Sequence, residues 1–262
     1  MDLGEFAHGP VTAELESGIL RILLNRPEKR NAVNSEMFDA LARLLAWSNG
    51  DPTVRAVLIA GSGTDFCAGI DAVELADRGA GTPVVAFEDR PVGRFVQELL
   101  RFEKTLIAAV KGRAIGFGLT LLFHCDLVYV ADDAVLRAPF ALLGLCPEAG
   151  SSLLAPMRVG HVRCFELFCL GRTLSGREAA LWGLANEAVA ESELEQKAFS
   201  AARQLADQSL RSVVACKRLM RRNLPLAEVV SRELAELAEL RCDPEASGAL
   251  SAAAAKLRTP ER

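Results

Sequence analysis

The feature that most constrains the fold is a short, fully apolar strand followed at once by a glycine-rich turn. Residues 106–110 read LIAAV, a run too short to cross a bilayer and typical of a strand buried on both faces of a parallel sheet. Gly112, Gly116 and Gly118 follow, and an apolar segment then begins at Leu119. Backbone N–H groups without partners collect where such a turn enters a helix. The segment therefore predicts a parallel α/β core with oxyanion-binding donors at a strand end.

A second turn of the same kind follows the apolar strand predicted at residues 54–60, and it occupies residues 61–71. Two backbone N–H groups that converge on one atom are what a developing enolate or tetrahedral oxyanion needs. The alternative is that these glycines only allow close packing of helix on strand. Neither a phosphate-binding G-x-x-x-x-G-K-[ST] loop nor a complete G-x-G-x-x-G motif with its spaced acid occurs, which disfavours a nucleotide cofactor.

Composition limits the class of protein and its partners. A chain of 262 residues with 50% hydrophobic content is long enough for one large α/β domain with an appendage. The net charge of −4 and the lack of a basic stripe argue against nucleic acid as a partner. The first residues form neither a secretory signal nor a membrane anchor, which predicts a cytoplasmic protein that does not bind membranes.

The chain offers few residues for metal or nucleophilic chemistry. With three histidines and no C-x-x-C or H-E-x-x-H spacing, we predict no metal site. The seven scattered cysteines are interpreted as reduced thiols that pack in the core, including Cys67 and Cys146 near the candidate loops. No G-x-S-x-G elbow is present, and His124 lies in an apolar run, so we assign it a structural role.

The remaining pattern predicts alternating strands and helices. Residues 11–16 and 19–25 are predicted to form a hairpin, and Ser35 is predicted to be the N-cap of a helix that ends at Trp47. Residues 71–94 are predicted to form an irregular loop with a short helix, and this loop is expected to control access to the site. A strand is expected at 126–131 and a loop leading into a helix at 142–150. Two capping boxes, Ser175 with Glu178 and Ser192 with Glu195, predict helix starts. An apolar stripe on the helical tail suits either its own core or another subunit; it comprises Leu226, Val230, Leu234 and Leu237.

Four segments resemble the enoyl-CoA hydratase/isomerase, or crotonase, superfamily: residues 25–34 (NRPEKRNAVN), 66–71 (FCAGID), 107–116 (IAAVKGRAIG) and 125–129 (CDLVY). The resemblance implies an α/β fold, a crotonase-like spiral of repeated ββα units with a C-terminal helical region. Residues 1–192 would form the spiral core and residues 193–262 the helical trimerisation region. It further implies a homotrimer or dimer of trimers, an acyl-CoA thioester as substrate, and no separate cofactor, since coenzyme A is part of the substrate.

The resemblance also implies roles for particular residues. The backbone N–H groups of Ile70 and Phe117 would hold the thioester oxygen. The substrate-binding residues would be Lys29, Arg30, Ala32, Ala68, Gly69, Ile70, Asp71, Ala72 and Phe117. Without the family context, Lys29 and Arg30 are two adjacent solvated cations.

Carboxylate placement separates the reactions of the superfamily. The two glutamate positions of a hydratase hold Thr120 and Phe140 here, and neither side chain can move a proton. The carboxylate that remains is Glu148, and its context resembles Δ3,Δ2-enoyl-CoA isomerases, in which one glutamate shuttles a proton. Taken alone, a Glu at a helix start more often complements the helix dipole. The alternatives are a hydratase-like or other crotonase-fold acyl-CoA enzyme such as a dehalogenase, or a non-catalytic CoA-ester binder.

Overall fold

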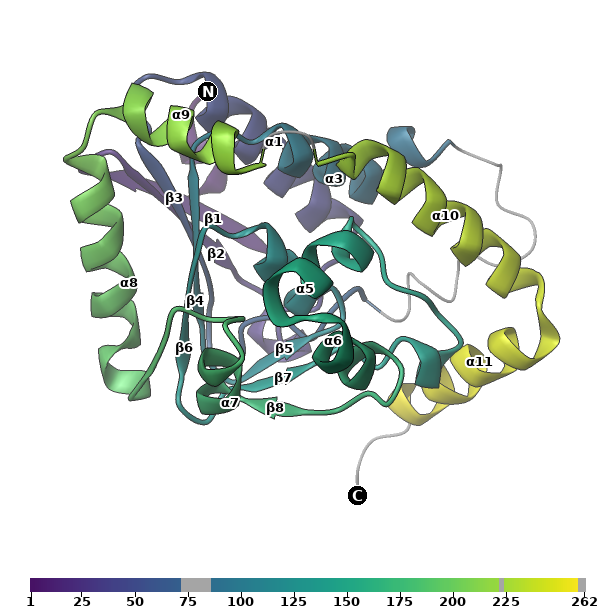
Figure 1. The fold of residues 1–262 in the computed structure, drawn as a ribbon. Helices are drawn as coiled ribbons and strands as arrows, with labels where there is room; N and C mark the ends of the chain where they lie inside the picture. The colour runs from purple at the N-terminus through teal and green to yellow at the C-terminus, as the bar shows by residue number, and fades with distance from the viewer. Residues whose placement is uncertain (72–85, 222–223, 259–262) are drawn as a thin grey trace.

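A six-stranded sheet forms the centre of the molecule (Figure 1). The computed structural model describes residues 1–71, 86–221 and 224–258. In spatial order the strands are β1 (Val11–Glu16), β2 (Ile19–Leu24), β3 (Ala56–Gly61), β4 (Thr105–Val110), β6 (Leu127–Ala131) and β9 (Glu187–Val189). Among the described strands of this sheet, only β1 and β2 pair antiparallel, and every residue of β3 and β4 is buried. The parallel core predicted from the apolar runs is confirmed.

A smaller sheet of three strands lies beyond the carboxyl ends of β4 and β6. It consists of β5 (Arg113–Ile115), β7 (Val135–Arg137) and β8 (Leu174–Ser175). Because β4 pairs with β6 and β5 pairs with β7, both in parallel, two successive strand–strand units stack side by side. An isolated bridge between Cys67 and Ala114 adds the segment after β3 to this stack. The two glycine turns are thereby brought to one end of the large sheet.

Helices cover both faces of the large sheet. On one face α8 (Glu191–Ala206) packs along β2, β3, β4 and β6, while α1 (Ser35–Gly50) and α3 (Pro91–Arg101) pack against each other on the opposite side (Figure 1). The other α-helices are α4 (Phe117–Thr120), α5 (Ser151–Val159), α6 (His161–Phe168), α7 (Gly176–Leu181), α9 (Leu210–Arg221), α10 (Leu226–Cys242) and α11 (Pro244–Arg258). The 3-10 turns are η1 (Leu3–Phe6), η2 (Pro27–Lys29), η3 (Phe87–Asp89), η4 (Leu121–His124) and η5 (Ala141–Leu143).

Three local predictions were wrong in position. The cap of α1 is Asn34, whose side chain accepts a hydrogen bond from Met37 N at 2.9 Å, and not the following serine. The capping box at Ser192 does not form, because the chain enters α8 directly from β9. The helix begins at Glu191, so Ser192 lies inside its first turn and Ala190 is the N-cap. Residues 91–94 are not loop, since Pro91 occupies the first turn of α3, where its fixed φ suits a helix start. Residues 72–85 of the predicted loop lie outside the described part of the chain.

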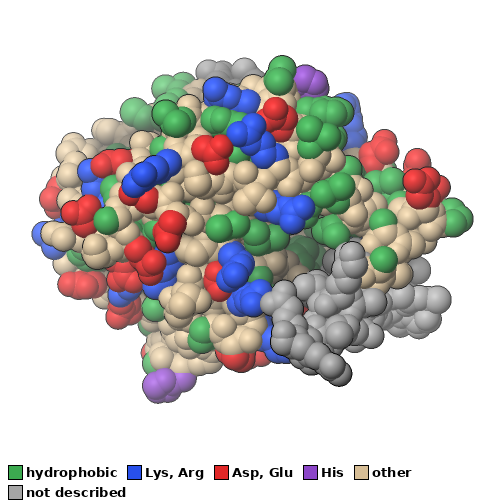
Figure 2. All heavy atoms as spheres, turned by 90° about the horizontal axis from the view of Figure 1, so that it is seen from below, with side chains coloured by type: hydrophobic (Ala, Val, Ile, Leu, Met, Phe, Trp, Pro, Cys, Tyr) green, Lys and Arg blue, Asp and Glu red, His purple; other side chains and the backbone are tan. Residues whose placement is uncertain are grey.

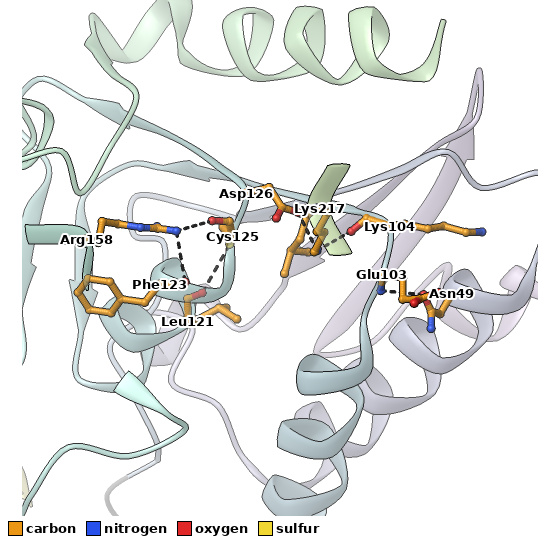
Figure 3. Close-up of polar contacts among 10 residues, drawn as sticks. Asn49, Glu103, Lys104, Leu121, Phe123, Cys125, Asp126, Arg158 and Lys217 are labelled. Carbon is orange, nitrogen blue, oxygen red and sulfur yellow. Dashed lines mark hydrogen bonds and ion pairs between the residues drawn. The ribbon is translucent and has the colours of Figure 1, made fainter. Parts of the chain in front are cut away.

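The C-terminal helices are fastened to the core by buried contacts. Lys217 on α9 donates to Asp126 Oδ2 at 2.8 Å and to the main-chain oxygen of Lys104 at 2.7 Å (Figure 3). On α10, Leu226 and Val230 are buried, whereas the next two members of the predicted apolar stripe are partly exposed. The first half of that stripe therefore packs on this chain's own core. The division predicted at residue 193 stays a prediction.

The surface carries charges of both signs. Basic and acidic side chains are interspersed on the face shown in Figure 2, without a continuous basic stripe on that face. Within the described residues, no helix is long and apolar enough to cross a membrane, and no group of three His, Cys, Asp or Glu side chains could hold a metal ion.

Candidate active site

The two glycine turns are joined by main-chain hydrogen bonds. Cys67 N donates to Arg113 O at 2.8 Å, and Ile115 N donates to Cys67 O at 2.9 Å. These bonds arise because the segment after β3 runs parallel to β5, which follows β4. The ends of the two turns, Ile70 and Phe117, are thus held on one frame.

Gly69 shows how closely the two turns approach. Its φ is +101°, and a Cβ at this position would lie 3.0 Å from Ile115 O and 3.9 Å from Phe117 N. Only glycine fits both the conformation and the space. Neither Ile70 N nor Phe117 N donates a hydrogen bond to another described residue. Two neighbouring turns therefore each carry, at the position predicted for the oxyanion, an N–H that has no acceptor in the described part of the chain.

Glu148 reaches the second of these turns through its side chain. The Thr120 hydroxyl donates to Glu148 Oε1 at 2.6 Å. Thr120 is fully buried in the last position of α4, the short helix that begins at Phe117. The predicted base is therefore tethered within one helical turn of a predicted oxyanion donor.

The surroundings of Glu148 raise its pKa from 4.5 to about 7. Burial of the carboxyl group is the largest cause, because a low-dielectric environment disfavours the charged form. The negative charge of Glu233 adds to the increase, while the Thr120 hydrogen bond opposes it. Glu148 as a whole is partly exposed, and its carboxyl group is largely surrounded by protein. A carboxyl with this pKa can both accept and return a proton near neutral pH.

Helix α5 connects this carboxyl to the segment that follows the oxyanion turn. At its N-terminus the Ser151 hydroxyl donates to Glu148 O at 2.6 Å. Towards its C-terminus Arg158 donates to the main-chain oxygens of Leu122 at 2.7 Å and Cys125 at 2.9 Å, in and just after η4 (Figure 3). One helix thus fixes the distance between the Glu148 turn and the α4–η4 segment.

The residues predicted to bind coenzyme A come together beside the first turn. Ala68 N donates to Arg30 O at 2.9 Å, and Val33, which follows Ala32, donates from its N to Gly69 O at 2.8 Å. The side chains of Lys29 and Arg30 are exposed. The carboxylate of Asp71 pairs with Arg26 at 2.8 Å and is turned to the protein. The predicted contact residue Ala72 lies outside the described residues.

Sequence reasoning missed three residues that shape the site. In the sequence, Thr120 is only the residue that replaces a hydratase glutamate, yet in the structure its hydroxyl donates to Glu148. Asn31 is fully buried with φ +56°, and its side chain donates to Ser62 O and Asp65 O at 2.9 and 2.7 Å, which ties the predicted CoA segment to the first turn. His124 contacts Ala149 O through Nε2 at 2.6 Å. An Asn in a left-handed conformation is a recognisable signal, whereas the other two contacts depend on tertiary structure.

The remaining candidates behave as packing groups or surface residues. Burial raises the pKa of the Cys67 thiol to about 12, so it is not a thiolate at neutral pH. Phe140 is buried against Phe168, with ring centroids 5.3 Å apart. The prediction that the cysteines pack in the core is wrong for Cys216 and Cys242, which are exposed on α9 and α10.

Comparison with known proteins places these features in a family. A model described as enoyl-CoA hydratase/isomerase matches residues 14–239. The 1,2-epoxyphenylacetyl-CoA isomerase of Escherichia coli (strain K12) is 36% identical over 203 residues, 76% of each chain. Enoyl-CoA delta isomerase 2 of Rattus norvegicus is 34% identical over 209 residues, 79% of this chain and 53% of the rat protein, so the chain spans about half of that relative's length. The solved structure of Pseudomonas aeruginosa OdaA matches with a TM-score of 0.87 at 40% identity, covering 94% of this chain and 98% of that one. The predicted α/β fold class is confirmed.

Proposed function

The chain belongs to the enoyl-CoA hydratase/isomerase family, and we propose that it is a Δ3,Δ2-enoyl-CoA isomerase. Its substrate would be a 3-enoyl thioester of coenzyme A, with the CoA portion along Lys29, Arg30, Ala32 and residues 68–72. No further cofactor is required, because the thioester itself makes the C2 protons acidic.

The reaction needs one base and one oxyanion site. Glu148 removes a proton from C2, and the electron pair moves onto the thioester oxygen to give a dienolate. The N–H groups of Ile70 and Phe117 stabilise that oxygen, each by roughly 3 kcal/mol. Glu148 then returns the proton to C4, which leaves the double bond between C2 and C3.

The observation that carries this proposal is the Thr120–Glu148 hydrogen bond of 2.6 Å, which places a carboxyl whose pKa is raised to about 7 beside the turn of Phe117. A base is most effective when its pKa lies near the working pH, since it must bind and release the same proton in each cycle.

Hydration is disfavoured because a second proton-transferring group is needed to activate water. The two positions where a hydratase carries glutamates are a buried threonine and a buried phenylalanine. The carboxylate whose charge acts on Glu148 is Glu233, and its two oxygens accept hydrogen bonds from Gly150 N and Ser152 N at 2.6 and 2.9 Å. A single-base reaction therefore fits these residues better.

A second candidate is isomerisation of an aromatic epoxide thioester, because a relative 36% identical is a 1,2-epoxyphenylacetyl-CoA isomerase. Both reactions begin with the same kind of carbonyl-bound thioester, so the acyl group decides between them.

The test is a coupled assay of purified protein with 3-enoyl-CoA esters of several chain lengths, 2-enoyl-CoA plus water, and 1,2-epoxyphenylacetyl-CoA. We expect conversion of a 3-enoyl ester that is lost in Glu148→Gln while CoA-ester binding persists. Hydration of 2-enoyl-CoA as the main activity, or retained turnover in the variant, would refute the proposal. Binding without turnover would identify a CoA-ester binder, and a trapped ester on Glu148 would point to dehalogenase-type chemistry.

We also propose a homotrimer or dimer of trimers. Large apolar side chains are exposed on and near α6 and α7, namely Val162, Phe165, Leu170 and Leu181, and a subunit interface would cover them. Analytical ultracentrifugation measures the assembly, and a monomer at micromolar concentration would contradict it.

A further inference from the structure

Glu233 on α10 supplies a helix cap that the local sequence lacks. Helix α5 begins at Ser151 after Gly150, which has no side chain to accept from the first free N–H groups. Glu233 Oε2 accepts from Gly150 N at 2.6 Å, and Oε1 accepts from Ser152 N at 2.9 Å. A carboxylate 83 residues away in sequence therefore caps α5.

The cap lies directly after the proposed base. Ala149 and Gly150 both adopt left-handed conformations, with φ of +56° and +79°. A left-handed alanine is strained and persists only where its surroundings determine it. His124 holds Ala149 O, and Glu233 holds the next N–H in the chain. The direction in which Glu148 leaves the backbone therefore depends on contacts from outside its own loop.

Other contacts bring α10 against the same loop. The Cys146 thiol lies 3.7 Å from Glu233 O, and Leu226 and Val230 lie beside Gly150. Glu233 itself is only 5% exposed. Burying a carboxylate is costly even with two donors, and an apolar side chain with a conventional cap on α5 would avoid the cost.

We propose that Glu233 is a positioning residue that holds the turn of Glu148 in its reactive orientation. The inference rests on the proposed function, because it assigns Glu233 a part in proton transfer by Glu148. Its negative charge also favours the protonated form of Glu148, as a second carboxylate nearby does.

The electrostatic part of the inference depends on all charges around the turn. The titratable and charged groups are Glu148 and Cys146 of the loop, Glu233 and Glu236 of α10, His124 of η4, Arg158 of α5, and Lys217 and Arg221 of α9. Burial lowers the pKa of His124 to about 3, so it is neutral at working pH. Among these groups, Glu233 is the charge that acts on Glu148.

The experiment compares Glu233→Gln and Glu233→Asp with Glu236→Gln, a control one turn along the same helix. In Glu233→Gln one N–H loses its acceptor and the charge is removed. We expect kcat to fall by roughly 10- to 100-fold with little change in KM. The pH midpoint of kcat should move down, because the like charge is gone. Glu233→Asp should keep the wild-type midpoint but lose kcat, since the shorter side chain reaches fewer donors.

A purely structural role gives a different result. If Glu233→Gln only unfolds more easily, while its folded fraction keeps the wild-type kcat and pH midpoint, the inference is overturned. Equal effects of Glu233→Gln and Glu236→Gln would overturn it as well.

A readout without turnover separates this inference from the proposed function. The unfolding free energy of wild type minus that of Glu148→Gln should fall as the pH rises and Glu148 ionises. The pH range over which this difference falls is the ionisation window of Glu148. Adding Glu233→Gln to both proteins should move that window to lower pH. If the wild type lacks isomerase activity and the window still moves, the proposed function fails, while the effect of Glu233 on the proton affinity of Glu148 stands. A window that does not move overturns the inference.

Discussion

Replacing Glu148 with Gln should abolish the proposed isomerase activity and stabilise the fold above neutral pH. The pKa of Glu148 is about 7 in the folded protein and 4.5 in the unfolded chain. Between pH 4.5 and pH 7, Glu148 therefore keeps its proton in the folded protein and has lost it in the unfolded chain. The free energy of unfolding therefore falls as pH rises from 4.5 to 7 and is then constant. At about 1.4 kcal/mol per pH unit the full cost of ionised Glu148 is about 3 kcal/mol, and partial solvent contact reduces it to between about 1 and 3 kcal/mol.

Glutamine has nearly the same shape and its carbonyl oxygen can still accept from Thr120, so the packing should persist. The measurement is denaturant unfolding of wild type and Glu148→Gln at several pH values from below 4.5 to above 7. We expect the two proteins to differ little at the acid end and the variant to be more stable at the alkaline end. Glu16→Gln, which changes an exposed carboxyl on β1, is the matched control. Curves that stay parallel over the whole range would show that Glu148 ionises normally, and the argument for a base poised near pH 7 would fail.

Three further changes probe the parts around this carboxyl. Thr120→Val removes the hydrogen bond that lowers the pKa of Glu148, so the pH midpoint of kcat should rise and stability should fall by about 1 kcal/mol, measured by pH–rate profiles and urea unfolding. Gly118→Ala would bring a Cβ to 2.6 Å from a main-chain oxygen of the first turn, so kcat should drop sharply in steady-state assays, whereas Gly50→Ala, in open space, should be neutral or slightly stabilising. Lys217→Met leaves a partly buried aspartate without its cation and should cost about 3 kcal/mol in thermal unfolding, against less than about 1 kcal/mol for loss of an exposed lysine from a surface pair.

The core was predictable because its signals are local. An apolar run such as residues 106–110 can be satisfied only by burial on both faces, and Ser17 and Gly18 in left-handed conformations close the first hairpin where the pattern breaks. Element boundaries were less predictable where two residues compete for one role. Asn34 and Ser35 are both good caps, and the hydrogen bond that decides between them depends on the path by which the chain arrives.

Site residues could be predicted only where the residue type and its neighbours in the sequence indicate the function. The glycine turns and Glu148 could be found because residue type and neighbouring sequence single them out. The Thr120 contact could not, since a threonine in an apolar segment has the same pattern whether its hydroxyl bonds to the preceding turn or to a carboxylate 28 residues away. Glu233 was hidden for the opposite reason: on a helix rich in Glu, nothing local separates the one buried carboxylate from its exposed neighbours.

The carboxyl groups of Glu148 and Glu233 lie at the same turn, and the charge of one affects the ionisation of the other. This coupling explains why we include the C-terminal helix α10 in the site. Burial raises the pKa of both Glu148 and Glu233. Two backbone N–H groups at a helix N-terminus donate to Glu233 and favour its charged form, whereas Glu148 has one hydroxyl donor. The hydrogen bonds therefore favour the charged form more at Glu233 than at Glu148, and a negative charge on Glu233 favours the protonated form of Glu148. Removing α10 would remove both the cap on α5 and the negative charge that raises the pKa of Glu148. The pKa of Glu148 would then lie closer to 4.5, and Glu148 would be a weaker base.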